Sequence, residues 1–417
     1  MHSTLITTFL LAIAAAASGV VEEASTDQDA SSSCGCKKSR SSLNSVDFNA
    51  LASSPSTTTD GDSCTAPPLP PSTPSTTTTS PPPRVIRLPP GTSIIGTNTP
   101  HFKEDAEGPV RSWTLKKPLW ADAFEVSNAR FSTFTNETMY VSEAHSYGWS
   151  FVHELAIPVD ARATISQAVQ DADWWLPVMN ASWQYPEGLQ GGGTNVMLDG
   201  REHHPAVHVS KRDGDAFCKW AGGRLPRESE WEYAARAGGP DSDLFPWGND
   251  FIQGGRRRRR GGGATTTPPN PSPRVFRANT WQGTFPRNNS VADGYAWTSP
   301  VDSFGEQNVW GFYNIIGNAW EWTSDEWCPK SKSPRHVTPP DCLRRDPSRL
   351  LDAGEVDFIK KGGSFMCHKS SCYRYRIAAR HYNSANSGAQ NLGFRCFYDK
   401  LPDWAVEHVP VPVTPSS

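Results

Sequence analysis

The sequence has little excess charge of either sign, because 40 Lys and Arg residues stand against 43 Asp and Glu residues. A formal net charge of −3 argues against a function that depends on binding nucleic acid or an anionic membrane surface. Beyond its N-terminal region the sequence also lacks an apolar run long enough to cross a bilayer. We therefore expect no membrane span in the mature chain.

The N-terminal region carries an apolar run at residues 5–17, followed by small residues up to Gly19. Although its basic flank is weak, this pattern is typical of a secretory signal peptide, which we expect to span residues 1–19. An oxidising compartment follows, where disulfides persist. Three Asn-X-Ser/Thr acceptor sites for glycosylation, at Asn136, Asn180 and Asn288, agree with that route.

Two stretches are low in complexity. Residues 20–84 are rich in Pro, Ser and Thr without apolar periodicity, and we expect a disordered tail. Its Cys34 and Cys36 either form a strained disulfide, exchange with a partner thiol, or are incidental. Residues 253–275 contain five consecutive arginines and predict a low-complexity surface insertion, either a docking patch for acidic partners or a solvated loop.

The remainder, residues 85–407, is rich in Trp and long enough for one large domain. Arg84-Val85-Ile86-Arg87-Leu88 predicts a first strand. A capping box at Ser210 predicts a helix that ends at Gly222-Gly223, and a second helix opens after Pro226 and ends before Gly238-Gly239. The rest is short, aromatic and punctuated by glycine, so we expect a largely irregular α+β fold.

Nine cysteines is an odd number, which leaves at least one thiol unpaired or bonded to another chain. Cys367 and Cys372 stand five positions apart and allow three readings. They form a short-loop disulfide, exchange electrons as a dithiol, or hold a soft metal ion such as Cu(I). The spacing weakens the second reading, since the dithiol motif is Cys-x-x-Cys.

Many short blocks of the folded region resemble the formylglycine-generating enzyme (sulfatase-modifying factor) family. The most specific block is residues 362–376, which contains the Cys-x4-Cys pair. The resemblance implies a fold related to C-type-lectin-like domains. The other blocks are residues 88–91, 124–128, 174–178, 204–210, 223–226, 230–233, 245–249, 314–322 and 391–396.

Members of this family convert a cysteine in a Cys-x-Pro-x-Arg motif of client sulfatases into formylglycine, with O2 as the electron acceptor. The resemblance implies that Cys367 and Cys372 bind copper as Cu(I) and that Ser364 lies beside them as a third catalytic residue. Because metal binding displaces thiol protons, copper affinity rises with pH. The alternative is a catalytically inactive paralogue that binds and regulates sulfatases or the active enzyme, although such paralogues lack the cysteine pair.

Matching positions also imply a substrate site. Arg380 and Asn391 would hold the client peptide, with Trp174 and Trp175 walling the cleft. Each of these residues has core packing or scaffold hydrogen bonding as its structural alternative.

The segment containing Trp149 and Ser150 also belongs to the implied substrate site. Some relatives carry there an acidic residue that suits the client arginine. Trp149 replaces it, so recognition of that arginine has either moved or uses stacking on the indole.

The resemblance further implies two structural calcium sites, built from oxygen donors as a hard cation requires. Glu125 would assist one of them. The first group is Asn279, Thr280, Asp293 and Tyr295, of which Thr280 and Tyr295 would contribute backbone carbonyls. The second group is Asn314, Gly317, Ala319 and Glu321, of which Gly317 and Ala319 would contribute backbone carbonyls.

The resemblance also implies how some of the cysteines pair. Cys218 and Cys396 match a structural pair of the family, whereas Cys328 and Cys342 are additional and expected to pair with each other.

We expect a protein of the endoplasmic reticulum lumen with some secretion, monomeric or homodimeric. Its C-terminus is no retrieval signal, so Cys34 or Cys36 would retain it through a resident thiol protein.

Overall fold

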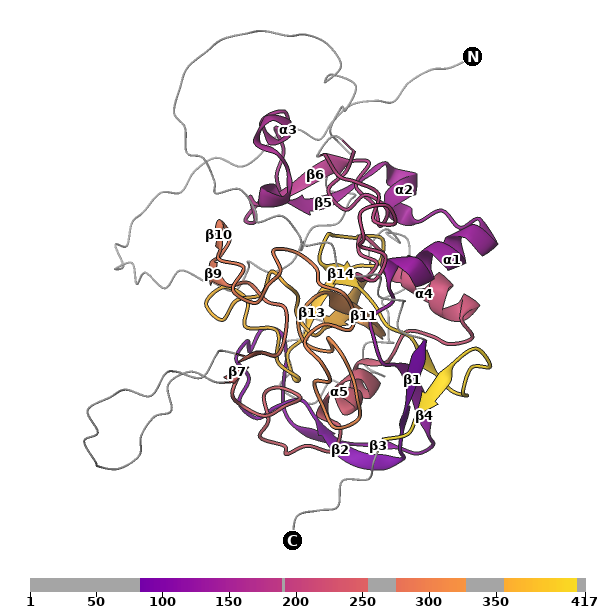
Figure 1. Cartoon of the computed structure of the whole chain (residues 1–417). Coiled ribbons are helices and arrows are strands. Elements are labelled where there is room, and N and C mark those ends of the chain that lie inside the picture. The colour runs from indigo at the N-terminus through magenta and orange to yellow at the C-terminus, as the bar shows by residue number, and fades with distance from the viewer. Residues whose placement is uncertain (1–82, 190–191, 254–274, 328–355, 411–417) are drawn as a thin grey trace, which may run out of the picture.

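A computed structural model describes residues 83–189, 192–253, 275–327 and 356–410 of the chain. The expected signal peptide, most of the expected disordered tail, the arginine run and Cys34, Cys36, Cys64, Cys328 and Cys342 lie outside these ranges. Helices and strands are both short, and much of the chain is irregular (Figure 1). The expected irregular α+β architecture is confirmed.

Two four-stranded sheets organise the fold. The first has the order β15-β4-β1-β16, and its strands are β1 (Arg84–Leu88), β4 (Leu119–Asp122), β15 (Phe397–Tyr398) and β16 (Val406–His408). β1 was expected as a strand from its sequence, and it pairs antiparallel with β4 and parallel with β16. The second sheet has the order β13-β12-β11-β14, formed by β11 (Trp320–Glu326), β12 (Asp357–Lys361), β13 (His381–Ser384) and β14 (Leu392–Gly393).

Four two-stranded ribbons surround these sheets. They are β2 (Gly91–Ile95) with β3 (Arg111–Leu115), β5 (Trp149–His153) with β6 (Trp175–Met179), β7 (Ile252–Gln253) with β8 (Val275–Phe276), and β9 (Gly283–Thr284) with β10 (Asn288–Asn289). Gln253 and Val275, expected inside the insertion, pair with each other as its two ends.

Five α-helices and one 3-10 turn fall within the described ranges: α1 (Asn128–Thr138), α2 (Glu143–Tyr147), the turn Glu154–Ala156, α3 (Val159–Ala163), α4 (Lys211–Trp220) and α5 (Glu228–Arg236). The Ser210 hydroxyl accepts a hydrogen bond from Asp213 N, which completes the expected capping box of α4. α5 lies between the β11 sheet and the β2–β3 ribbon (Figure 1). None of the described helices combines the length and apolar character that a bilayer crossing needs.

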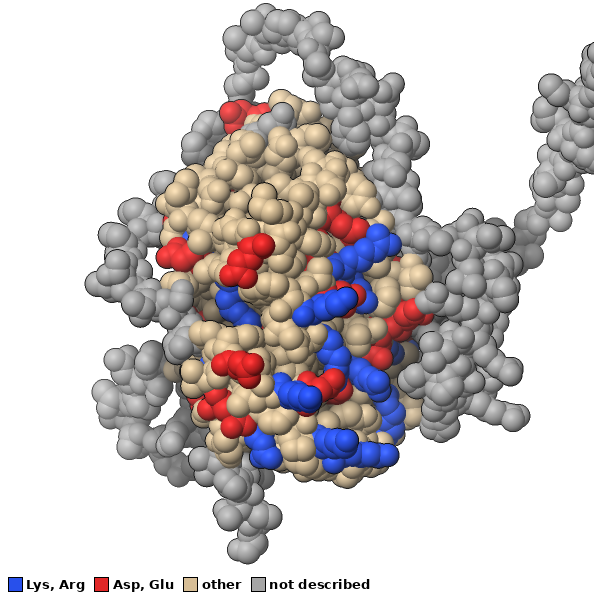
Figure 2. Space-filling model, turned by 90° about the vertical axis from the view of Figure 1, so that its right-hand side faces the viewer, with Lys and Arg blue, Asp and Glu red and all other residues tan. Residues whose placement is uncertain are grey.

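The core surrounds a buried ion pair. Arg395 Nη2 donates to Glu321 Oε1 at 2.6 Å, and Trp231 Nε1 from α5 donates to Glu321 Oε2 at 2.7 Å. Both charged groups are buried, so this pair joins α5 to β11 at the centre of the molecule. On the face shown in Figure 2, basic and acidic side chains are mixed, in keeping with the small net charge.

Candidate active site

The Cys-x4-Cys segment begins where β12 ends. Gly362 and Gly363 both adopt positive φ, at 91° and 74°. A Cβ on Gly363 would come within 2.8 Å of the Tyr375 backbone, so glycine is required for this close approach. The pair turns the chain away from the sheet and directs the following loop into the interior.

Cys367 and Cys372 are both fully buried, and their Sγ atoms lie 2.9 Å apart. This separation is longer than a disulfide bond of about 2.05 Å, so the two sulfurs are not bonded to each other. Cys367 keeps its thiol, whereas Cys372 is disulfide-bonded in this structure. Burial raises the pKa of the Cys367 thiol to about 11. Once the Cys372 disulfide is reduced, two adjacent, buried thiolates fit a soft ion such as Cu(I) better than a hard one.

Ser364 and Asn391 complete a cluster with the cysteines. Ser364 N donates to Cys367 Sγ at 3.4 Å, and Asn391 Nδ2 donates to the Ser364 hydroxyl at 3.0 Å. Asn391 precedes β14, and its carbonyl accepts from Trp320 N of β11. The structure therefore brings together four of the expected site residues from two segments.

Arg380 is held by a different set of partners. Its Nη2 donates to Glu228 Oε2 at 3.0 Å, its Nε lies 2.8 Å from Glu228 Oε1, and its guanidinium stacks on Trp327 at 4.9 Å. Lys361 Nζ lies 3.7 Å from the same carboxylate. Burial opposes ionisation of Glu228, but Arg380 and Lys361 outweigh it and lower the pKa of this carboxyl.

The expected aromatic residues of the substrate site lie on the β5–β6 ribbon or next to it. Trp149 is only 6% exposed and packs edge-on against Phe151. Trp175 is buried, while Trp174 packs edge-on against Phe285 at 5.0 Å. These contacts place Trp149 and Trp175 in the core and Trp174 near its edge.

Ser150 is buried within β5. Its hydroxyl donates to Gly388 O at 3.2 Å and lies 2.9 Å from His208 Nδ1. The neighbouring Phe151 O accepts from Gln390 N. Ser150 thus helps to join the ribbon to the segment that carries Asn391.

The first expected calcium group contains an unpartnered buried oxygen. Asn279 Oδ1 has no hydrogen-bond partner among the described residues. The Asp293 carboxylate accepts from Thr280 N at 3.0 Å and from Tyr295 N at 3.2 Å, and burial raises the pKa of its carboxyl to about 6. A buried amide oxygen beside a buried carboxylate fits an oxygen-preferring cation.

The second group shows the same feature at Asn314 Oδ1, which also lacks a partner in the described structure. Glu125 Oε1 accepts from Ala319 N at 3.0 Å, and burial and the Glu321 carboxylate raise the pKa of Glu125 to about 8. Glu321 is already held by Arg395 and Trp231, so a cation there would share it. Gly317 lies in the same loop, with φ of 87°. No cluster of three or more His, Cys, Asp or Glu suited to a metal occurs in the described ranges, so each group would combine its carboxylate with amide and backbone carbonyl oxygens.

The Cys218–Cys396 disulfide is present, with the two Cα atoms 5.4 Å apart. It links α4 to the segment between β14 and β15. The expected Cys328–Cys342 pair falls outside the described residues.

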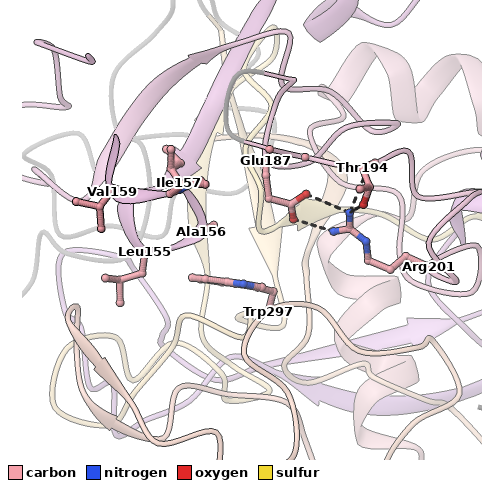
Figure 3. A pocket seen from close by; sticks show the side chains of 11 residues that line it. Leu155, Ala156, Ile157, Val159, Glu187, Thr194, Arg201 and Trp297 are labelled. Carbon is pink, nitrogen blue, oxygen red and sulfur yellow. Dashed lines mark hydrogen bonds and ion pairs between the residues drawn. The ribbon is translucent and has the colours of Figure 1, made fainter. Parts of the chain in front are cut away.

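Two pockets open near the cysteine cluster, although neither is lined by a cysteine. The larger has a volume of about 490 Å³ and includes Trp297, Glu187 and Arg201 (Figure 3). The smaller, of about 410 Å³, includes Trp174 and Phe285.

Sequence reasoning missed several residues around this site. Trp281 N donates to Cys367 O at 3.0 Å, which joins the loop that follows Asn279 and Thr280 to the cysteine loop. Glu228 binds Arg380, and Glu187 binds Arg201 at 2.7 Å in the larger pocket. In the sequence Glu187 is marked only by the glycine that follows it, and a Glu-Gly pair is too common to indicate a functional site.

The geometry defines a buried cysteine-based site on an irregular α+β scaffold, and the sequence is similar to that of known proteins. Residues 70–400 match the sulfatase-modifying factor enzyme 1-like domain. The formylglycine-generating enzyme of Bos taurus is 44% identical over 319 residues, which cover 76% of this chain and 75% of that protein. The chain therefore belongs to the sulfatase-modifying factor enzyme 1-like family.

Relatives of two kinds occur in this family. The formylglycine-generating enzyme of Thermomonospora curvata is 41% identical over 318 residues, covering 76% of this chain and 94% of that protein. The inactive C-alpha-formylglycine-generating enzyme 2 of Bos taurus is 36% identical over 314 residues, covering 75% and 87%.

Proposed function

We propose that this protein is a copper-dependent oxidase that converts the cysteine of a Cys-x-Pro-x-Arg motif in client sulfatases to formylglycine. The observation that carries the proposal is the pair of buried sulfurs, Cys367 and Cys372, 2.9 Å apart beside the Ser364 hydroxyl. The similarity to formylglycine-generating enzymes supports the reaction class.

In the balanced reaction R–CH2–SH + H2O + O2 → R–CHO + H2S + H2O2, two electrons would pass from the client's thiol-bearing carbon to O2, sulfur would leave as hydrogen sulfide, and water would supply the aldehyde oxygen. Bound Cu(I) would supply the one-electron chemistry that O2 needs to react with a thiol. Cys367 and Cys372 would hold the ion, which requires reduction of the Cys372 disulfide and loss of the Cys367 proton. Ser364, oriented by Asn391, would present its hydroxyl to the client thiol or to O2.

The test is to incubate the purified protein with Cu(I), O2 and a Cys-x-Pro-x-Arg peptide, and to follow conversion of thiol to aldehyde by mass spectrometry. We expect conversion by the wild type and none by Cys367→Ser or Cys372→Ser. Lys369→Ala, an exposed change in the same loop, serves as the control and should stay active. Absence of turnover by the copper-loaded wild type would refute the oxidase.

The alternative is a catalytically inactive protein that binds and regulates sulfatases or the active enzyme. The 36% identity to an inactive relative supports this alternative function. Binding of the peptide without conversion would support this second function.

We further propose where the protein acts, how it is retained there and which cation it binds. Client sulfatases would be met unfolded in the endoplasmic reticulum lumen, after removal of residues 1–19. Retention would use Cys34 or Cys36, and replacing both with Ser should then increase secretion. Calcium would occupy the groups around Asn279 and Asn314, whose unpartnered oxygens support it.

A further inference from the structure

The larger pocket combines an apolar wall with a charged wall. In Figure 3 the Trp297 ring lies between the aliphatic side chains of Leu155 and Ile157 and the charged pair of Glu187 and Arg201. Leu155 is 40% exposed and Trp297 is partly buried, so the pocket opens to solvent while offering an aromatic surface. Long side chains with an apolar stem suit such walls.

Glu187 and Arg201 are the charged residues that line the pocket, and Asp199, which lies outside the lining, adds one surplus negative charge to this group of three. Arg201 Nη1 and Nη2 donate to the two oxygens of Glu187 at 2.7 and 3.1 Å, and Arg201 Nε donates to Asp199 Oδ2 at 2.8 Å. Two carboxylates thus share one guanidinium. Each Glu187 oxygen keeps a lone-pair direction for a further donor. The wall is therefore complementary to a cationic ligand group.

Trp297 also meets the requirement for cation recognition better than Trp149 does. A guanidinium or ammonium binds over the face of an indole within about 6 Å of its centre. Trp149 is only 6% exposed, whereas Trp297 lines an open pocket. An incoming cation therefore has access to the Trp297 ring and not to the Trp149 ring.

The pocket lies close to the cysteine loop. The Trp297 ring centre is 5.8 Å from that of Phe365, which stands two positions before Cys367. In an extended Cys-x-Pro-x-Arg peptide, the arginine lies four residues beyond the cysteine, a span of at most about 13–14 Å. The contact between Trp297 and Phe365 places the pocket beside the cysteine loop, which is the arrangement that a peptide of this length would need.

We propose that Glu187 and Trp297 form the binding site for the basic side chain of the client motif, taking the place of the acidic residue absent at Trp149. The inference rests on the proposed function for the identity of the peptide. Glu187 would accept hydrogen bonds from the guanidinium, Trp297 would stack beneath it, and Leu155 and Ile157 would contact its aliphatic stem.

The experiment compares two peptides that differ only in Arg or Gln at the last motif position. For the wild type we expect kcat/KM to favour the Arg peptide by tenfold or more. Glu187→Gln and Trp297→Leu should each reduce this preference to less than threefold, by raising KM for the Arg peptide with kcat little changed. Glu137→Gln, an exposed change on α1, should leave the preference intact.

A binding measurement separates this inference from the oxidase itself. Fluorescence anisotropy with labelled peptides in which Ser replaces the reactive Cys should show the same Arg-over-Gln preference and the same losses. Thermal melting of each variant identifies any that fail to fold, and Trp297→Leu tests the site without removing a carboxylate from Arg201. If both folded variants keep the wild-type preference, or if Trp149→Leu alone abolishes it, the assignment is wrong. If no peptide is converted yet anisotropy shows the expected pattern, the oxidase fails and the binding site stands.

Discussion

Arg380 and Glu228 show how a single residue depends on a partner distant in the sequence. The guanidinium meets the carboxylate at 2.8 and 3.0 Å and is stacked on Trp327. These contacts fix the side chain on one side and leave its remaining donors to be directed elsewhere. Glu228 is therefore a positioning residue for Arg380.

Glu228→Gln is expected to raise KM for a client peptide about tenfold and to lower kcat much less, because it loosens Arg380 without touching the cysteines. It should also lower thermal stability, since Arg380 and Lys361 would lose a buried counter-charge. Steady-state kinetics and thermal melting give the two readouts. Glu306→Gln, which breaks the exposed pair with Arg84, should change neither. An unchanged KM for Glu228→Gln would remove its positioning role.

His153 gives the fold a dependence on acidic pH. The imidazole is buried, its Nδ1 accepts from Leu155 N at 3.2 Å, and Trp281 and Trp297 lie 5.4 and 5.7 Å from it. Burial lowers its pKa from 6.5 to about 3, so the folded state favours the neutral ring. Stability is thus complete above pH 6.5 and falls as pH drops from 6.5 towards 3.

At pH 5 the buried His153 should lower the free energy of unfolding by about 2 kcal/mol relative to pH 7. Denaturant unfolding at several pH values measures the slope. His153→Phe, which keeps a ring in the aromatic cluster, should flatten the acid limb. The same slope in wild type and variant would show that other groups control acid unfolding.

The residue scale also marks what a sequence can reveal. Cys367, Cys372, Ser364 and Asn391 were expected together because their motifs resemble those of a known family, and hydrogen bonds now join them. The partner of Arg380 was not predictable, because Glu228 lies 152 positions away along the chain, in a helix whose end signals say nothing of what it packs against. Contacts between distant side chains depend on packing that no local pattern encodes.

At the scale of elements, the β7–β8 ribbon closes the base of the arginine-containing insertion. Gln253 pairs with Val275, and Ile252 pairs with Phe276. Because these antiparallel partners already bring the ends together, a two-residue turn can replace the intervening segment.

Replacing residues 254–274 with Asn-Gly should therefore leave the melting temperature within about 2 °C and kcat/KM for a short peptide unchanged. Differential scanning fluorimetry and the peptide assay test both expectations. Loss of activity towards whole sulfatases, with peptide activity retained, would instead assign client docking to the arginine run.

Local signals predicted elements unevenly. α4 and α5 were expected because capping residues and terminal glycines mark their ends. The β11 sheet was not expected, since β14 has two residues and pairs with a strand some 70 positions earlier. Short strands of this kind carry too few residues for a period-two pattern to emerge.

At the scale of the whole molecule, two loops around the sheets carry buried oxygens without partners, at Asn279 and Asn314. If calcium occupies them, chelation should lower the melting temperature of the entire domain by several degrees. A site at 100-fold excess of ligand over its dissociation constant contributes about 2.7 kcal/mol.

The measurement is a thermal melt after dialysis against a chelator, repeated with added Ca²⁺ or Mg²⁺. Calcium should restore the transition and magnesium should restore it poorly, because carboxylate, amide and backbone oxygens in irregular loops suit the flexible coordination of calcium better than the strict octahedron of magnesium. Asn279→Ala and Asn314→Ala should each reduce the calcium-dependent shift. A chelated protein with an unchanged transition would leave these oxygens unexplained by calcium.

The parallel pairing of β1 with β16 has a consequence for biosynthesis. Arg84 aligns with Val406 and Ile86 with His408, so the first described strand waits for the last before its sheet is complete. At 5–20 residues per second, the ribosome needs roughly 15 to 65 seconds to make the chain between them. Until then the edge of β1 that will pair with β16 stays open in the growing polypeptide, where it is exposed to pairing with other chains.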